Sequence, residues 1–236
     1  MPRPAAAALI ALGALSACMA RAPSHPELAA AAQRDDPLVM YDALEALIAA
    51  GKATPADREY AYAVVSKQNA DTAGAAFARA AITGRVVQEK GLVAAHLVPD
   101  VEREARRSRD LDPQFRDGAA TRLLGTLYVI APATLLEHGD SETGLELLEE
   151  LTAAHPNVPE NHLRLAEAYV TLHDPEPAGP HLCFVLDQQA ELGREDQQLL
   201  KGLLDEAGPL PCPVPPAPGA RPAAPGTGST APPAAQ

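Results

Sequence analysis

The histidines gather in the C-terminal half of the chain, and they are the first residues to consider for metal or catalytic chemistry. They are His138, His155, His162, His173 and His181. No pair among them has the close helical spacing that zinc ligands need. His162 also takes a position that a bulky aromatic residue fills in the helical repeat described below, so packing explains it. The pattern predicts no metal and no cofactor.

Motifs of the common catalytic sites are missing from the sequence. It contains no His-Glu-x-x-His, no glycine-rich phosphate loop and no Gly-x-Ser-x-Gly. Without a nucleophile and a base at matching spacing, the chain is predicted to bind rather than to catalyse.

Cys18 has a sequence context of its own. It follows Leu15-Ser16-Ala17, at the end of an apolar run that begins at Ala5 and is too short to span a bilayer. The tetrapeptide resembles the bacterial lipobox, in which Cys18 would be acylated and become the first residue of the mature protein. Residues 1–17 are then a lipoprotein signal peptide, and the acyl chains anchor the protein to a membrane. The alternative is an ordinary secretory signal with a chance cysteine.

Two further cysteines, Cys183 and Cys212, allow two interpretations. Cys183 lies among Leu182, Phe184 and Val185, which favours a buried free thiol. Export to an oxidising compartment would also allow a disulfide to Cys212.

A repeated pattern of small and large residues indicates the elements that position these side chains. Residues 122–128 match the Leu-Gly-x-x-Tyr of a tetratricopeptide first helix, residues 144–151 match its second helix, and residues 165–185 hold a second copy. A weaker third copy precedes them. The key positions are Leu124, Gly125, Tyr128, Gly144, Leu148, Leu151, Pro156, Ala166, Tyr169, Ala178 and Leu182. Their spacing favours closely packed helices.

The predicted fold is therefore all-α, a tetratricopeptide-like α-solenoid of antiparallel helix pairs over residues 37–207. Asp36 before Pro37 begins one helix, Thr54 the next, and Asp71 is expected to cap a third that runs to about residue 90. Pro99 must start or kink the helix expected at about residues 92–109. Residues 18–36 are expected to form a tether. Residues 208–236 hold ten prolines and one charged residue, which predicts a disordered tail.

The charge of the chain is strongly negative and unevenly distributed. The formal net charge is -12, and residues 137–206 contain sixteen acidic and three basic residues. This balance argues against nucleic acid and anionic lipid as partners. Residues 102–109 alternate arginine with glutamate, which favours a solvated, internally paired helix face over an anion site.

Candidate binding residues follow from the repeat register. The first helix of each repeat lines the concave face of a tetratricopeptide stack, which places Arg122, Thr126, Arg164 and Glu167 there. Arginines at such positions can bind a partner's carboxylates. Pairing with neighbouring acids is the alternative.

The second candidate surface is an insertion of seven residues between Tyr128 and Gly144. It contains Leu135 and Leu136, which have no reason to stay in water. We expect it to form an apolar wall of the concave channel near Tyr128 and Tyr169. The alternative is a plug between adjacent repeats.

The order of these features resembles the T component of TRAP transporters. The features are the lipobox, the helical N-terminal third, Leu-Gly-x-x-Tyr, the proline-bearing insertion, a Gly-Asp helix start, Pro-Glu-Asn at residues 159–161 and Leu-Ala-Glu-Ala. The resemblance covers residues 36–206. It implies a periplasm-facing lipoprotein of the bacterial envelope that binds a periplasmic solute-binding protein, and it is compatible with a homo-oligomer. The alternative is a tetratricopeptide lipoprotein that scaffolds an envelope or pilus assembly complex.

Overall fold

The computed structural model describes residues 25–208 and residue 212. Every regular element in that part of the chain is an α-helix or a 3-10 helix, which confirms the all-α fold class. The predicted signal peptide (1–17), the acylation site Cys18 and nearly all of the proline-rich tail lie outside the described residues.

The helices follow one another with short connections. In chain order they are α1 (Pro26–Ala32), α2 (Pro37–Ala49), α3 (Pro55–Val65), α4 (Ala73–Lys90), η1 (Gly91–Leu97), α5 (Val98–Leu111), α6 (Ala119–Ile130), η2 (Ala133–Leu135), α7 (Ser141–Ala154), α8 (Pro159–Thr171), α9 (Ala178–Asp187), η3 (Gln189–Glu191) and α10 (Arg194–Ala207).

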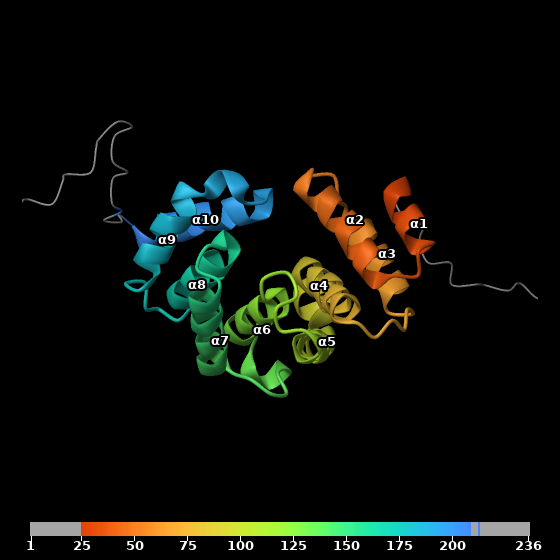
Figure 1. Ribbon diagram of the computed structural model, residues 1–236, viewed down its shortest axis with the longest axis horizontal. Helices are drawn as coiled ribbons and strands as arrows, with labels where there is room; N and C mark the ends of the chain where they lie inside the picture. Colours follow the sequence, from red (N-terminus) through yellow and green to blue (C-terminus); the bar gives the residue numbers. More distant parts are fainter. Residues whose placement is uncertain (1–24, 209–211, 213–236) are drawn as a thin grey trace, which may run out of the picture.

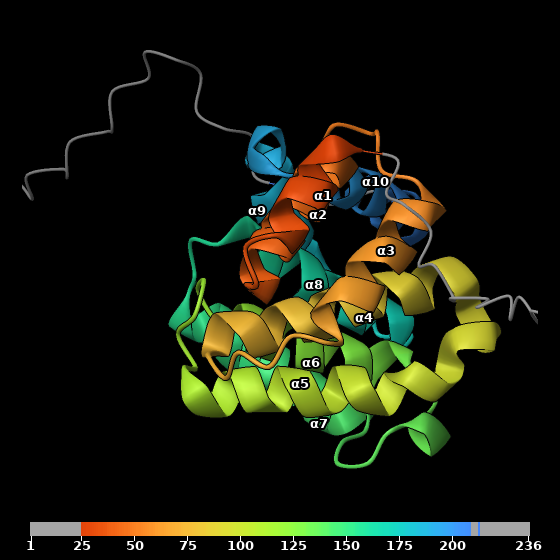
Figure 2. The same ribbon diagram turned by 90° about the vertical axis from the view of Figure 1, so that its right-hand side faces the viewer.

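The described residues form an open arc (Figure 1). Helices α1 to α3 stand at one end, α4 to α6 form the base, and α7 to α9 rise at the other end. Helix α10 then runs back across the opening toward α2, and Figure 2 shows both helices above the layer formed by α4 and α5. Helices α2 and α10 therefore face each other across the opening of the arc.

Polar caps explain where several helices begin. The backbone N–H of Leu38 donates to Asp36 at 2.9 Å, and Thr54 and Asp57 form a reciprocal capping box at the start of α3. Helix α4 is capped by Thr72, whose hydroxyl accepts from the N–H of Ala75 at 3.1 Å. The prediction that Asp71 caps this helix is wrong.

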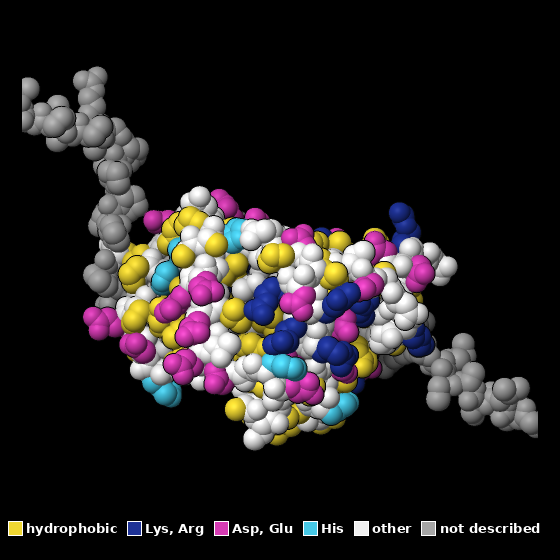
Figure 3. Space-filling model, turned by 60° about the horizontal axis from the view of Figure 1, so that its bottom comes forward, with side chains coloured by type: hydrophobic (Ala, Val, Ile, Leu, Met, Phe, Trp, Pro, Cys, Tyr) yellow, Lys and Arg dark blue, Asp and Glu magenta, His cyan; other side chains and the backbone are white. Residues whose placement is uncertain are grey.

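Asp71 instead pairs with Arg107 of α5, at 2.7 Å between carboxylate and guanidinium. On the same helix Arg103 contacts Asp100 and Glu104. Figure 3 shows arginines and acids mixed over this outer face. The expected pairing within α5 is thus found at Arg103, whereas Arg107 pairs with a residue outside this helix.

The core consists of several clusters along the arc. One joins α1, α2 and α3 around Leu28, Met40 and Leu44, and another joins α8, α9 and α10. Leu28 is fully buried, and it lies in α1, within the stretch that the sequence analysis assigned to the tether. Part of residues 18–36 is therefore folded, because an apolar side chain in its short alanine-rich segment finds a surface to cover.

Helices α6 and α7 approach each other closely through two glycines. A Cβ at Gly144 would lie 2.7 Å from the carbonyl oxygen of Gly125, and a Cβ at Gly125 would lie 2.6 Å from Leu148 Cγ. Any side chain at either position would separate the helix axes. This is the close contact that the small repeat positions predict.

A disulfide joins Cys183 of α9 to Cys212, with Cα atoms 5.3 Å apart. The sequence allowed either a buried free thiol at Cys183 or a disulfide to Cys212, and the structure contains the disulfide. The bond fixes the beginning of the proline-rich segment against α9.

The insertion between α6 and α7 lies on the outer side of the arc, at the bottom of Figure 1. Leu136 packs against Ala80, Ala105, Leu124 and Tyr128 in a cluster of α4, α5 and α6. The prediction that Leu135 and Leu136 wall the concave channel is therefore wrong, and the insertion instead covers a seam between helices.

The side chain of Glu102 of α5 binds the backbone of this insertion. Its carboxylate is 1% exposed and accepts hydrogen bonds from the N–H groups of Glu137 (2.7 Å) and His138 (2.9 Å) and from the hydroxyl of Tyr128 (2.9 Å). Burial raises the pKa of Glu102, but these hydrogen bonds outweigh it and hold the pKa below its usual range. A buried carboxylate on α5 thus decides which way the loop turns.

Candidate functional site: the concave cavity

A cavity of about 420 Å³ lies on the inner side of the arc, and we call it the concave cavity. Its walls come from α2, α4, α5, α6 and α8 and from the first turn of α10. A volume of this size accommodates a small-molecule ligand.

Four arginines and four acidic residues contribute to its wall. They are Arg85, Arg122, Arg164 and Arg194, and Glu45, Glu160, Glu195 and Asp196. Such a concentration of arginine is unusual in a chain with a net charge of -12.

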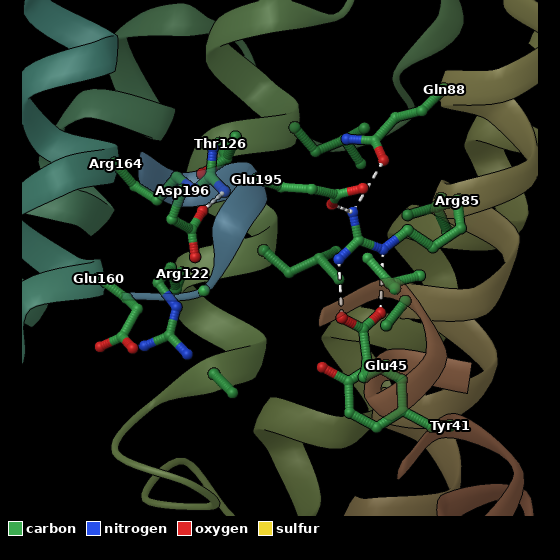
Figure 4. A pocket seen from close by; sticks show the side chains of 18 of the residues that line it. Tyr41, Glu45, Arg85, Gln88, Arg122, Thr126, Glu160, Arg164, Glu195 and Asp196 are labelled. Carbon is green, nitrogen blue, oxygen red and sulfur yellow. Dashed lines mark hydrogen bonds and ion pairs between the residues drawn. The ribbon is translucent and has the colours of Figure 1, made fainter. Parts of the chain in front are cut away.

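Arg85 of α4 bridges the two ends of the arc (Figure 4). Its guanidinium donates twice to Glu45 of α2, at 2.9 and 2.8 Å, and once to Glu195 of α10, at 2.5 Å. Burial lowers the pKa of Arg85, but its two carboxylate partners raise it above the ordinary arginine value. A further N–H group of Arg85 donates to the amide oxygen of Gln88 at 3.4 Å, so this arginine is held by protein acceptors on two sides.

Arg164 of α8 is occupied in the same way. It donates to Glu167 at 2.8 Å and to Asp196 at 2.6 Å. The first turn of α10 thus inserts two carboxylates between arginines of α4 and α8.

Arg122 of α6 has no such carboxylate. Its guanidinium donates to the amide oxygen of the fully buried Asn161 at 2.6 Å. No carboxylate in the described part of the chain lies within 4.0 Å of its nitrogen atoms. Burial is the largest influence and lowers the pKa of Arg122; the nearby carboxylate of Glu160 raises this pKa, and the charge of Arg164 lowers it further. A charge that is partly removed from water and has no carboxylate at ion-pair distance is costly, unless a ligand supplies one.

Three of the candidate binding residues lie where the repeat register predicts them. Arg122, Thr126 and Arg164 line the concave cavity. Glu167 lies beside it and pairs with Arg164 rather than contributing to its wall.

The other candidates lie away from the concave cavity. Tyr128 is 3% exposed and points toward Glu102, and Tyr169 donates its hydroxyl to Glu149 of α7 at 2.6 Å. Both tyrosines therefore act in helix packing. The prediction that Tyr128, Tyr169, Leu135 and Leu136 contact a ligand in the concave channel is wrong, because none of them lines the cavity.

Sequence reasoning missed the contribution of Arg85, Glu45 and the start of α10. The run Arg194-Glu195-Asp196 resembles any acidic first turn of a helix. Its position inside the arc depends on how the whole arc curves, which local sequence does not report.

The histidines do not form a metal site in the described residues. His162 and His181 contact each other, with their Nδ1 atoms 2.8 Å apart. No group of three or more histidine, cysteine, aspartate or glutamate side chains in residues 25–208 and 212 is arranged to hold a metal ion.

Within the same residues, no helix is both long enough and apolar enough to span a bilayer. Comparison with protein-family models gave no match to any family, and comparison with curated proteins gave no match either.

Proposed function

We propose that this chain is a non-enzymatic lipoprotein of the bacterial envelope that binds a ligand or partner in the concave cavity. In this proposal it serves as an accessory component of a TRAP-type solute transporter and works with a periplasmic solute-binding protein. The arc is proposed to be a tetratricopeptide-like solenoid, which the close α6–α7 pair and the order of the helices support.

The observation that carries the proposal is Arg122. An arginine that faces a cavity, carries no carboxylate partner among the described residues and has lost part of its hydration is poised for an anionic group. Two other arginines of the cavity wall, Arg85 and Arg164, hold protein carboxylates, which supports the proposal that the cavity suits such groups.

Gly84 offers a way to test the role of the concave cavity. It lies in α4 and lines the cavity, and a Cβ built there meets nothing within 4 Å. Gly84→Leu should fill the cavity without disturbing the fold. Gly202 in α10 has the same open surroundings but does not line the cavity, so Gly202→Leu is the matched control.

Both variants should melt at or above the temperature of the wild type, because a mid-helix glycine is replaced. Surface plasmon resonance should then measure binding of the solute-binding protein encoded by a neighbouring gene. We expect Gly84→Leu to weaken binding about tenfold or more and Gly202→Leu to leave it unchanged. Equal binding by the two variants would show that the concave cavity does not bind this partner. Neighbouring genes for pilus or outer-membrane assembly would instead favour the alternative function, a scaffold for an envelope complex.

The lipid anchor has a separate test at Cys18. Because Leu-Ser-Ala-Cys follows the apolar run, metabolic labelling with a fatty acid should mark the wild type and not Cys18→Ser. Equal labelling of both proteins, or of neither, would reject acylation at this residue.

A further inference from the structure

The 3-10 helix η1, which joins α4 to α5, exposes two adjacent apolar side chains. Leu92 is 89% exposed and Val93 is 80% exposed, far more than the other exposed large hydrophobic residues of the described chain. We call this pair the η1 patch. Figure 2 shows the connection from α4 to α5 at one end of the layer that these two helices form. Apolar side chains gain nothing from water, so the η1 patch is open to contact with another apolar surface.

Packed residues of η1 hold the patch outward. Ala94 and Leu97 are buried and form a small cluster with Val86 of α4, against which Tyr62 of α3 also packs. Gly91 begins η1 with a φ of 56°, a conformation that favours glycine and turns the chain out of α4. The patch is therefore presented by an element that is fastened to the protein on its inner side.

The charged residues beside the patch neutralise one another. Lys90 precedes η1 and pairs with Glu59 of α3 at 2.9 Å, and Arg58 contacts Glu89 at 4.0 Å. This part of the surface thus lacks the excess of acidic residues found in residues 137–206. A lipid surface would meet balanced charges there, and burial of apolar area would supply the attraction.

The predicted acylation site is close enough to bring a bilayer to this patch. His25, the first described residue, contacts the carboxylate of Asp57 at 3.0 Å, and Asp57 lies two residues before the Glu59 that pairs with Lys90. The start of the described chain and the start of η1 are therefore both fixed to the first half of α3. Cys18 precedes His25 by seven residues, which span at most about 25 Å.

We propose that the η1 patch inserts into the surface of the bilayer that holds the acyl chains of Cys18. Leu92 and Val93 would then form a second membrane contact beside the lipid anchor. This inference rests on the proposed function, because it requires the anchor. The lipid surface that fits is zwitterionic, since the charges beside the patch are already paired. An anchor at one end of the chain leaves the protein free to rotate, whereas a second contact fixes which face it turns to the bilayer.

Fluorescence of the acylated protein on vesicles tests this contact. The protein is expressed from its full-length sequence in bacteria that acylate lipoproteins, and it is reconstituted into phosphatidylcholine vesicles. Val93→Cys provides the attachment site for a dye whose emission depends on polarity, because acylation blocks Cys18 and the disulfide blocks Cys183 and Cys212. We expect the dye to emit at a shorter wavelength there than at a control position, and nitroxide-labelled lipids to quench it several-fold more strongly.

Leu111→Cys provides the control position. Leu111 is also an exposed apolar residue, but it lies at the opposite end of α5 from η1, about 20 Å away along the helix. A dye at Leu111→Cys should keep the emission of a probe in water and should be quenched little.

A charge placed in the patch should abolish the contact. Leu92→Glu should remove most of the wavelength shift and of the quenching at Val93→Cys, whereas Leu111→Glu adds the same charge elsewhere and should leave both unchanged. Leu92→Glu should keep the melting temperature of the wild type, because the side chain is 89% exposed. It should also float with the vesicles, because the acyl chains suffice for membrane binding.

Two results would overturn the inference and leave the lipid anchor in place. The first is equal emission and equal quenching at the two dye positions on vesicles that carry the protein. The second is a shorter wavelength at Val93→Cys without quenching by nitroxide-labelled lipids, because a protein surface would then cover η1.

Protein that carries no fatty acid and does not float with the vesicles would reject the anchor and this inference together. The experiment with the solute-binding protein and Gly84→Leu would still decide whether the concave cavity binds a partner, since it does not depend on a membrane.

Discussion

At the scale of single residues, this chain uses partly buried polar groups in two different ways. Glu102 is satisfied by three donors and fastens a loop, whereas Arg122 has one acceptor and faces a cavity. A buried polar group without a hydrogen-bond partner lowers the stability of the fold. The unsatisfied N–H groups of Arg122 are therefore better explained by binding than by folding.

The contact between His162 and His181 predicts a dependence of stability on pH. Burial lowers the pKa of His162, and burial together with the nearby His162 lowers that of His181. The folded protein therefore binds fewer protons than the unfolded chain near pH 6.5. The stabilisation is complete above the unfolded pKa of about 6.5 and is lost as pH falls through the lowered folded values.

The melting temperature of the wild type should thus fall between pH 8 and pH 5, and His181→Gln should make this fall shallower. His96→Gln, at an exposed position of η1, is the control and should keep the slope of the wild type. A slope that His181→Gln does not change would mean that other groups set the acid sensitivity.

At the scale of elements, the contact between α6 and α7 depends on two missing side chains. A Cβ added at Gly125 would lie 3.0 Å from the carbonyl oxygen of Gly144, and a Cβ added at Gly144 would lie 2.7 Å from that of Gly125. Backbone atoms cannot move aside as a flexible side chain can, so even one methyl group must separate the helices.

Gly144→Ala should lower the free energy of unfolding by roughly 1–3 kcal/mol through overpacking. Gly202→Ala in α10, where an added Cβ meets nothing within 4 Å, should raise it by about 0.5–1 kcal/mol. Urea unfolding of both variants measures the difference. The same sign of change in both would contradict the close approach of the two helices.

At the scale of the whole molecule, the arc closes through few contacts. Glu195 of α10 pairs with Arg85 at 2.5 Å and contacts Arg58 of α3 at 3.7 Å, and Arg194 lies against Gly51 in the connection between α2 and α3. Because Glu195 is 44% exposed, these ion pairs contribute little to stability. They can nevertheless set how far apart the two ends of the arc stand.

Glu195→Gln should broaden the distribution of distances between α10 and the connection of α2 to α3. It should lower the free energy of unfolding by less than about 1 kcal/mol. Spin labels at Lys52→Cys and Lys201→Cys, in a Cys18→Ser background, report this distance by electron-electron resonance. High salt should broaden the distribution of the wild type in the same direction, because it screens exposed charges. Glu150→Gln on α7 is the control, and an unchanged distribution in Glu195→Gln would argue against closure by these pairs.

Several features could be predicted from the sequence because they depend on short-range physics. Helix starts at Asp36 and Thr54, the close contact at Gly125 and the placing of Arg122, Thr126 and Arg164 follow from capping chemistry and helical period. Both cysteines of the disulfide were also visible, although their pairing was one of two alternatives.

Only the tertiary structure decided where the insertion and α10 lie. The insertion turns outward because Glu102, about 35 residues earlier in the chain, offers its backbone N–H groups a buried carboxylate. Helix α10 enters the arc because the curvature of the nine described α-helices before it brings Arg85 and Arg164 within reach of its first turn. Both placements depend on contacts between distant residues, and a periodicity that repeats every few residues carries no information about them.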